Sequence, residues 1–199
     1  MNSYAQRELP VAKTMVVVLS LVTVLASATV AGATTSSTPK KWVTTLCTTF
    51  LSWEQAVKTG DVKLNKALAQ VEKSKHANLK QVRDQLATFL GDFAVASHHA
   101  RAQMAAVGAP SVPHGAQIQS TVVNALGTAA SFLDRAKASV KKFPTNNAAA
   151  FIRKTQALSK SITTTFDRVG SSLSALTKYK ATQLEAAAKA DASCRKLAG

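Results

Sequence analysis

Acidic side chains are scarce in this chain, and the short motifs that mark common enzymes are missing. Only 10 of its 199 residues are Asp or Glu. The carboxylates of Asp84, Asp92, Asp134 and Asp167 are scattered in a way that suits solvated helix surfaces, so a paired general acid and base is remote. The sequence has no glycine-rich phosphate loop, nucleophile elbow or zinc-protease motif. We therefore expect a protein that is not an enzyme and that holds no cofactor.

Histidine is also sparse, and its four positions do not suggest a metal site. His98 and His99 are adjacent, so on a helix their side chains point about 100° apart and cannot readily share one ion. Asp92 lies two helical turns from His99, and the sequence pattern indicates no metal ligand on another helix. We interpret His76, His98, His99 and His114 as surface or bundle-edge residues and expect no bound metal.

The N-terminus differs from the rest of the chain. Arg7 and Lys13 precede an apolar run from Thr14 to Val30, which ends in Ala31-Gly32-Ala33. A basic start, an apolar middle and a small-x-small exit are typical of a secretory signal peptide, so we predict a leader of residues 1–33. The run has 17 residues, fewer than the ~20 of a comfortable membrane span, although an uncleaved N-terminal anchor is the alternative. We expect a protein that is secreted or held at the extracellular face of the cell envelope.

Cysteine occurs only twice, at Cys47 and Cys194. Two cysteines in an exported chain are most simply one disulfide. The alternative, a reactive thiol, would need an activating base nearby, and neither cysteine has a sequence neighbour of that kind. We predict a Cys47–Cys194 disulfide, which could contribute up to about 5 kcal/mol in the chain-entropy model because it closes so long a loop.

The chain after the predicted leader, residues 34–199, is long enough for one domain with a real core. Its apolar residues recur at spacings of three and four, as on the buried side of α-helices, and no stretch alternates long enough to be a strand. Thr38 followed by Pro39 predicts the first helix start, with a hydroxyl cap and proline at the first helical position. We predict an all-α fold, a single helical-bundle domain.

The two cysteines select a topology for that bundle. If the chain reversed at Gly60, Cys47 and Cys194 would lie roughly 70 Å apart along the axis at ~1.5 Å of rise per residue, too far for a disulfide. If the chain instead kinks at Gly60 and continues to about Ser74, later reversals bring both cysteines toward one end. We therefore predict an up-down-up-down bundle of four long helices, the first kinked near Gly60, stapled by one disulfide.

The last stretch, from Ala148 to Lys196, is predicted to form one very long helix. Its apolar stripe from Phe151 to Leu176 should belong to the core. After Leu176 the stripe thins, and the alanine-rich segment that follows has high helix propensity but little area to bury. We expect this second half to pack weakly and to depend on Cys194.

Basic residues dominate the charge of the chain, and their distribution is uneven. The chain carries 25 Lys and Arg against 10 Asp and Glu. Seven basic and two acidic residues lie between positions 58 and 83, and seven basic residues and no acid lie between 135 and 160. In the predicted bundle both stretches flank turns at the end away from the disulfide. This set, which we call the basic pole, comprises Lys58, Lys63, Lys66, Lys73, Lys75, Lys80, Arg83, Arg135, Lys137, Lys141, Lys142, Arg153, Lys154 and Lys160.

Two interpretations of the basic pole are open. It can simply keep an exported protein soluble, or it can attract a polyanion such as a phosphate-bearing wall polymer, an anionic lipid head group, an acidic polysaccharide or nucleic acid. Lysine dominates, which favours point-charge contacts over bidentate recognition. Aromatic residues lie mostly on the apolar stripes, so no stacking platform for bases is visible and sequence-specific nucleic-acid binding is not expected. We predict a weak, salt-sensitive contact with an anionic cell-wall polymer or a membrane surface.

A protein-binding module without a polyanion role, secreted or tethered by an uncleaved leader, is the main rival. Six alanines between positions 94 and 106 allow either a shallow groove for a partner or the close approach of two helices. A tightly packed seam is the simpler interpretation. An exposed apolar patch of several hundred Å² would instead favour a partner.

Several features together resemble a known group of proteins. They are the leader, Trp42, Cys47 and Trp53 in the first helix, the Gly108-Ala109-Pro110-Ser111-Val112 loop, the Pro144-Thr145 cap and the Cys194-Arg195-Lys196-Leu197 end. This set resembles small secreted helical proteins of high-GC Gram-positive bacteria, most of them uncharacterised. The resemblance implies an exported bundle with a terminal disulfide. It carries over no catalytic residues, because the group has no agreed activity.

Overall fold

Four long helices make up most of the computed structural model, which describes residues 36–73 and 78–197. They are α1 (Pro39–Lys73), α2 (Leu79–Val107), α3 (Gly115–Val140) and α4 (Ala148–Ser174). Shorter segments follow as η3 (Ala175–Tyr179), α5 (Thr182–Ala190) and α6 (Ala192–Leu197). The helical fold predicted from the sequence is confirmed, whereas the predicted leader lies outside the described residues.

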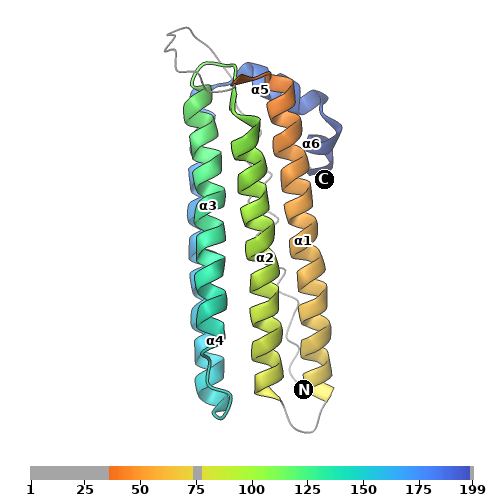
Figure 1. The fold of residues 1–199 in the computed structure, drawn as a ribbon, viewed down its shortest axis with the longest axis vertical. Helices are drawn as coiled ribbons and strands as arrows, with labels where there is room; N and C mark the ends of the chain where they lie inside the picture. The colour runs from red at the N-terminus through yellow and green to blue at the C-terminus, as the bar shows by residue number, and fades with distance from the viewer. Residues whose placement is uncertain (1–35, 74–77, 198–199) are drawn as a thin grey trace.

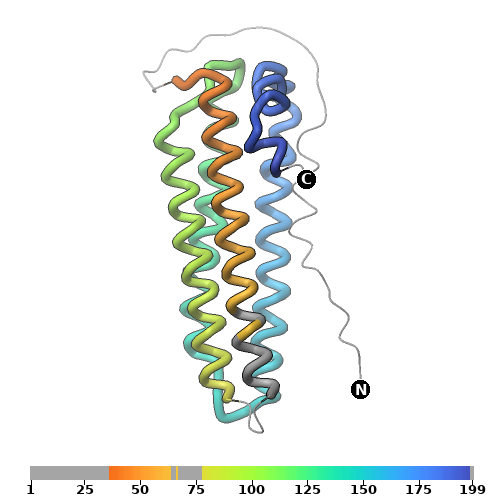
Figure 2. Tube along the Cα trace, turned by 90° about the vertical axis from the view of Figure 1, so that its right-hand side faces the viewer, coloured from red at the N-terminus to blue at the C-terminus, as the bar shows by residue number. Residues whose placement is uncertain are grey.

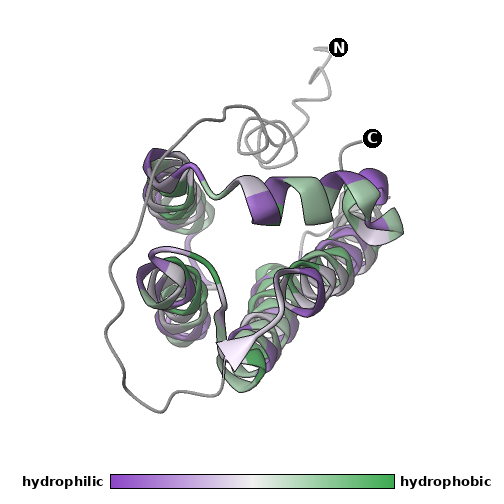
Figure 3. Ribbon diagram, turned by 90° about the horizontal axis from the view of Figure 1, so that it is seen from above, coloured by the Kyte–Doolittle hydropathy of each residue, from purple (hydrophilic) through white to green (hydrophobic). Residues whose placement is uncertain are grey.

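The long helices lie side by side, and consecutive helices run in opposite directions (Figures 1 and 2). α2 packs against α1 and α3, and α3 also packs against α4. In the view along the long axis, apolar residues of the helices face the space between them (Figure 3). We call the end where α1 begins the clasp end, and the end where α1 finishes and α4 begins the basic end.

Side-chain caps set the starts of three long helices. The Thr38 hydroxyl accepts a hydrogen bond from the Lys41 amide at 3.2 Å, so the predicted start of α1 is confirmed. Asn78 caps α2 by accepting from the Gln81 amide at 3.1 Å. Asn147 caps α4 by accepting from the Ala150 amide at 2.9 Å. Each cap supplies a partner to an amide that has none within the first turn of its helix.

Gly60 lies inside α1, which continues without a break from Pro39 to Lys73. A Cβ atom at this position would lie 2.8 Å from Cδ2 of Phe89 on α2. The glycine therefore lets an aromatic ring approach the backbone of α1, a role that its helix-breaking tendency alone does not reveal. A kink near Gly60 stays a prediction.

Two short strands were not expected from the sequence. β1 (Ser36–Ser37) pairs in parallel with β2 (Ala109–Pro110), with Ser36 opposite Ala109. The Ser111 amide adds a hydrogen bond of 2.8 Å to the Ser37 carbonyl. Strands of two residues leave no alternating pattern to detect, and they attach the segment before α1 to the loop after α2.

The core is aromatic where α1, α2 and α4 meet. The ring of Trp53 lies 5.2 Å from that of Phe93 and 6.1 Å from that of Phe166, between centroids. The Trp53 indole N–H donates to the Ser97 hydroxyl at 2.9 Å, and that hydroxyl donates to the Phe93 carbonyl at 2.9 Å. This arrangement satisfies the polar atoms of a fully buried serine, as a dry interior requires.

Small residues line the contact between α2 and α3. Ala94 and Ala100 of α2 are buried, as are Ala129 and Ala130 of α3. Small side chains let two helix backbones approach closely, so these alanines belong to a packed seam. Not all of the six alanines between positions 94 and 106 belong to this seam, because Ala102 and two further alanines near the end of α2 are exposed.

The prediction of one helix from Ala148 to Lys196 is wrong. α4 ends at Ser174, Lys180 adopts a left-handed conformation with φ 47°, and the chain returns through α5 and α6. The physical reason is length. Along a straight helix at ~1.5 Å per residue, Cys194 would overshoot the level of Cys47 by roughly 30 Å. Folding back at the clasp end removes this overshoot.

Candidate functional site

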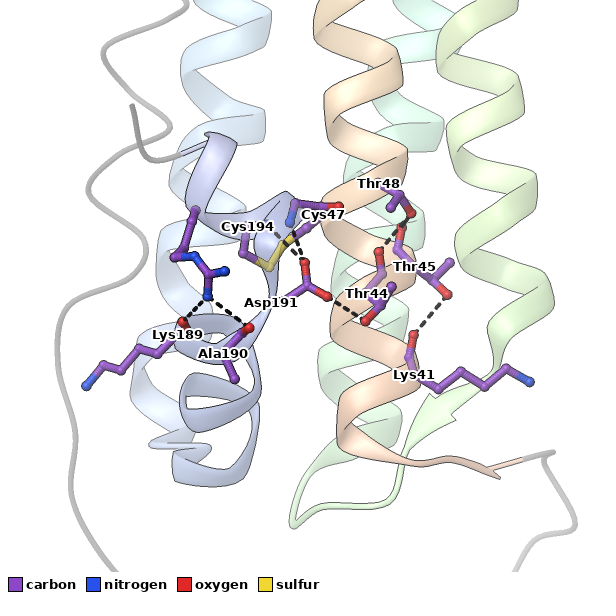
Figure 4. The surroundings of a disulfide bond; sticks show 11 residues. Lys41, Thr44, Thr45, Cys47, Thr48, Lys189, Ala190, Asp191 and Cys194 are labelled. Atoms are coloured by element: carbon purple, nitrogen blue, oxygen red, sulfur yellow. Dashed lines mark hydrogen bonds between the residues drawn. A yellow bond between two sulfur atoms is a disulfide. The ribbon is translucent and has the colours of Figure 1, made fainter.

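The clasp end is closed by the disulfide between Cys47 of α1 and Cys194 of α6, as predicted. The two Cα atoms are 5.0 Å apart and 147 positions apart in sequence. Both cysteines are buried. Figure 4 shows the bond between the returning chain and the first turns of α1.

Asp191 adds a second attachment beside the disulfide. Its Oδ2 atom accepts a hydrogen bond from the Thr44 hydroxyl at 2.6 Å. Its Oδ1 atom accepts from the backbone amides of Ser193 at 2.8 Å and Cys194 at 3.1 Å (Figure 4). The Thr44 hydrogen bond, followed by those of the two amides, lowers the pKa of this carboxyl against the opposing effect of burial. Asp191 therefore both starts α6 and joins it to α1.

Asp191 was not predicted from the sequence to have a role, although a signal was present. An aspartate directly before a short Ala-Ser-Cys segment fits an N-cap. The alanine-rich pattern on both sides suggested a continuous helix and concealed this break. The contact to Thr44, 147 positions away, has no sequence signal.

The fourteen residues of the basic pole are distributed over all four long helices and their adjoining turns. Ten of them are exposed: Lys58, Lys63, Lys66, Lys80, Arg135, Lys141, Lys142, Arg153, Lys154 and Lys160. Arg83 and Lys137 are half-buried. Lys75 and the side chain of Lys73 lie outside the described residues. The turns at which α2 begins and α3 ends lie together at the basic end (Figure 1).

The basic pole extends well along the bundle. At ~1.5 Å of rise per residue, Lys58 lies about 22 Å from the end of α1, and Lys160 lies about 18 Å from the start of α4. The cations thus cover the half of the bundle nearest this end.

Acidic neighbours compensate part of the pole on α1 and α2. Lys58 pairs with Glu54 at 2.6 Å, and Asp84 pairs with Arg83 at 2.8 Å and with Lys80 at 3.6 Å. The hydrogen bond from Arg83 is the main cause of the lowered pKa of Asp84, with the nearby charges of Arg83 and Lys80 adding to it. These pairs leave less free charge on the α1–α2 half of the pole.

The α3–α4 half of the pole has no such compensation within the described chain. Its exposed cations are Arg135, Lys141, Lys142, Arg153, Lys154 and Lys160. None of these six is in an ion pair with a described acidic residue. Asp134, the acid adjacent to this group, pairs with His98 at 2.7 Å across the α2–α3 seam. We call these six residues the α3–α4 cluster. Among the described residues of the pole, it is the part with the most unpaired charge.

The histidines of the described chain lie in different contacts and do not form a cluster. His98 pairs with Asp134, and the ring of His114 lies 5.0 Å from that of Tyr179. Over residues 36–73 and 78–197, no group of three His, Cys, Asp or Glu side chains is arranged to hold a metal ion. His76 lies outside these ranges.

Exposed large hydrophobic residues occur singly in the part of the chain that the structure describes. They are Val62 on α1, Val95 on α2 and Ile152 on α4. Scattered apolar residues of this kind are common on monomer surfaces. A search of the described helices finds none long and apolar enough to cross a membrane.

Comparison with known proteins gives no assignment. No protein-family model, no curated protein and no solved structure matches this chain. A function for this chain is therefore inferred from its own residues.

Proposed function

We propose that this is an exported, non-enzymatic binding protein that uses its basic pole to contact anionic polymers or lipid head groups of the cell envelope. The observation that carries the proposal is the α3–α4 cluster, six exposed cations without an acidic partner in the described chain. Uncompensated surface charge of one sign produces a potential that attracts polyanions. The predicted leader, and the resemblance to secreted helical proteins, support an extracellular location as part of the same proposal.

Lysine-rich contact of this kind should be weak and sensitive to salt. Exposed charges are screened over a Debye length of about 8 Å at physiological ionic strength and about 3 Å at 1 M. The clasp end also carries exposed lysines, among them Lys40, Lys41, Lys189 and Lys196, so a matched change there shows whether the position of the charge matters. Phosphate-bearing wall polymer and anionic lipid share the chemistry that such a surface recognises, so separate assays must distinguish them.

The test compares two variants with the same change in net charge. In the first, Lys141, Lys142, Arg153 and Lys154 of the α3–α4 cluster are replaced by Gln. In the second, four exposed lysines at the clasp end are replaced by Gln: Lys40, Lys41, Lys189 and Lys196. Binding to isolated cell wall and to anionic vesicles is measured by co-sedimentation at low and high salt.

Binding that is lost in the cluster variant, retained in the clasp-end variant and weakened by salt supports the proposal. Equal losses in both variants indicate that net charge alone drives binding and that the basic pole has no special part in it. Absence of binding to both wall and vesicles at low salt rejects the proposal. Mass spectrometry of the exported protein shows whether the leader has been removed.

A further inference from the structure

A cavity of about 150 Å³ that is partly open to solvent lies at the clasp end, away from the basic pole. Its lining includes Trp42 of α1 and Ile118 of α3 on one side, and Leu176 of η3 with Leu184 and Ala188 of α5 on the other. The chain that returns after α4 thus forms one wall, and the first turns of α1 form the opposite wall.

The lining offers little to water or to an ion. The indole N–H of Trp42 donates to Gln119 Oε1 at 2.6 Å, so the polar atom of this ring is already satisfied outside the lining. Among the described residues, no buried side-chain nitrogen or oxygen lacks a hydrogen-bond partner. A water held stably needs two to four polar partners, and the buried side chains of this lining offer none that is unpaired.

The charged residues of the lining are one cation and one anion, Lys180 and Glu185. Lys180 is exposed and Glu185 is half-buried, so their charged groups belong to the solvent side of the cavity. Because the two charges are opposite, the lining has no net charge that would select an ionic ligand. The chemistry of the cavity favours an uncharged apolar occupant.

Several constraints keep the walls of this cavity in place. The disulfide holds Cys194 of α6 to Cys47, which itself lines the cavity, and Asp191 holds the same segment to Thr44. The apolar lining that faces solvent in this cavity would lose hydration and gain dispersion contacts if an apolar group covered it. A space of this volume with an apolar lining is large enough for a molecule the size of benzene.

We propose that the clasp cavity binds an uncharged apolar group of about the size of benzene, either a free small molecule or the end of a larger amphiphile. This inference is independent of the proposed envelope contact, because the two sites lie at opposite ends of the bundle. Binding would add contacts between α1 and α5 and would stabilise the clasp.

Fluorobenzene is the probe for the test, observed by ¹⁹F NMR with the oxidised wild-type protein. We expect a saturable change in its signal that toluene competes away. Replacing Ala188, which lines the cavity, by Leu should fill the space and weaken fluorobenzene binding at least tenfold. The matched control is Ala186→Leu, because Ala186 is exposed on the same helix and is not in the lining.

A second filling variant, Leu176→Phe, guards against misfolding of the first variant, and thermal unfolding with free-thiol titration identifies a variant that has lost its fold. Competition by 1-decanol, whose chain is longer than the cavity, shows that the end of an amphiphile is accepted. Failure of decanol to compete assigns the site to free small molecules. No saturable signal with the wild type, or equal binding by the filled variants and the Ala186→Leu control, overturns the proposal.

Discussion

The two ends of the bundle are held by different kinds of interaction. At the clasp end, a disulfide and the hydrogen bonds of Asp191 join segments 147 positions apart. At the basic end, the turn from α3 to α4 is held by an edge-to-face contact of Phe143 with Phe151 and by the Asn147 cap. The same end carries the α3–α4 cluster, whose cations repel one another.

The two ends therefore differ in how their segments are attached to one another. Covalent and hydrogen-bonded attachment is concentrated where the chain must fold back, and it depends little on salt. The basic end relies on apolar packing and local caps, which leave its cations free for solvent or an anionic partner. Changes at each end can test this difference, and loss of the disulfide is expected to have the largest effect.

Loss of the disulfide should produce the largest change. Replacing Cys47 and Cys194 by Ser removes a constraint worth up to about 5 kcal/mol, which corresponds to a fall in Tm of about 10–20 °C for a chain of this size. Hydrogen exchange should show early loss of protection in α5 and α6. A Tm that does not change in reducing agent would contradict the importance assigned to the clasp.

Truncating Phe151 should produce the next largest change, at the other end. Phe151 is the one described residue of α4 that is buried, so Phe151→Ala should cost about 3 kcal/mol and loosen the start of α4. The control is Ile152→Ala, since Ile152 is adjacent and 53% exposed, and its effect should stay within about 0.5 kcal/mol. Urea denaturation measures both, and equal effects would show that burial of Phe151 does not hold this end.

Removal of the Asp191 carboxylate should cost about 1 kcal/mol, the usual value of a helix cap. The matched change at the basic end is Asn147→Ala, which removes one capping bond to Ala150. Asp191→Ala should be the more costly of the two because it also removes the bond from Thr44. Thermal unfolding at neutral pH compares them, and a larger cost for Asn147→Ala would reverse our ranking of the two attachments.

The smallest effect concerns the carboxyl pKa values of Asp191 and Asp84, both of which are lowered. A lowered pKa means that the ionised group stabilises the fold above the unfolded value of about 3.9, and that this stabilisation is lost as pH falls through the folded value. Salt should raise the pKa of Asp84, which depends on charged Arg83 and Lys80. Asp191, held mainly by hydrogen bonds from uncharged groups, should respond less.

Carboxyl-carbon NMR titrations at about 0.05 M and 1 M salt would measure this difference. An equal response of the two groups would show that their lowered pKa values have the same electrostatic origin.

Local sequence patterns were enough to identify the helices and one of their caps. Thr38-Pro39 marked the start of α1, and spacings of three and four marked the buried sides of the helices. The same reasoning failed at Ala175–Tyr179 and at Lys180, because high helix propensity continues through Glu185 to Lys189 while the chain there must turn back. Helix propensity is a weak local preference that tertiary constraints override.

The candidate site was only partly predictable for a related reason. The uneven distribution of cations is a property of the sequence, and it predicted the basic pole without coordinates. Which cations remain unpaired depends on side chains from neighbouring helices, as the contact of His98 with Asp134 shows. The clasp cavity has no sequence signal, because its walls come from three separate helical regions.

The sequence by itself determined the helical character of the chain, the number of its cysteines and the positions of its charges, since these follow from residue type and local spacing. The tertiary structure decided where the chain turns back after α4, which cations stay free and that a cavity remains beside the disulfide. These features depend on contacts between segments up to 147 positions apart, which local sequence does not encode. The physical reason is that a disulfide can form only when its two cysteines lie close together, so the returning chain has to break its helix to reach Cys47.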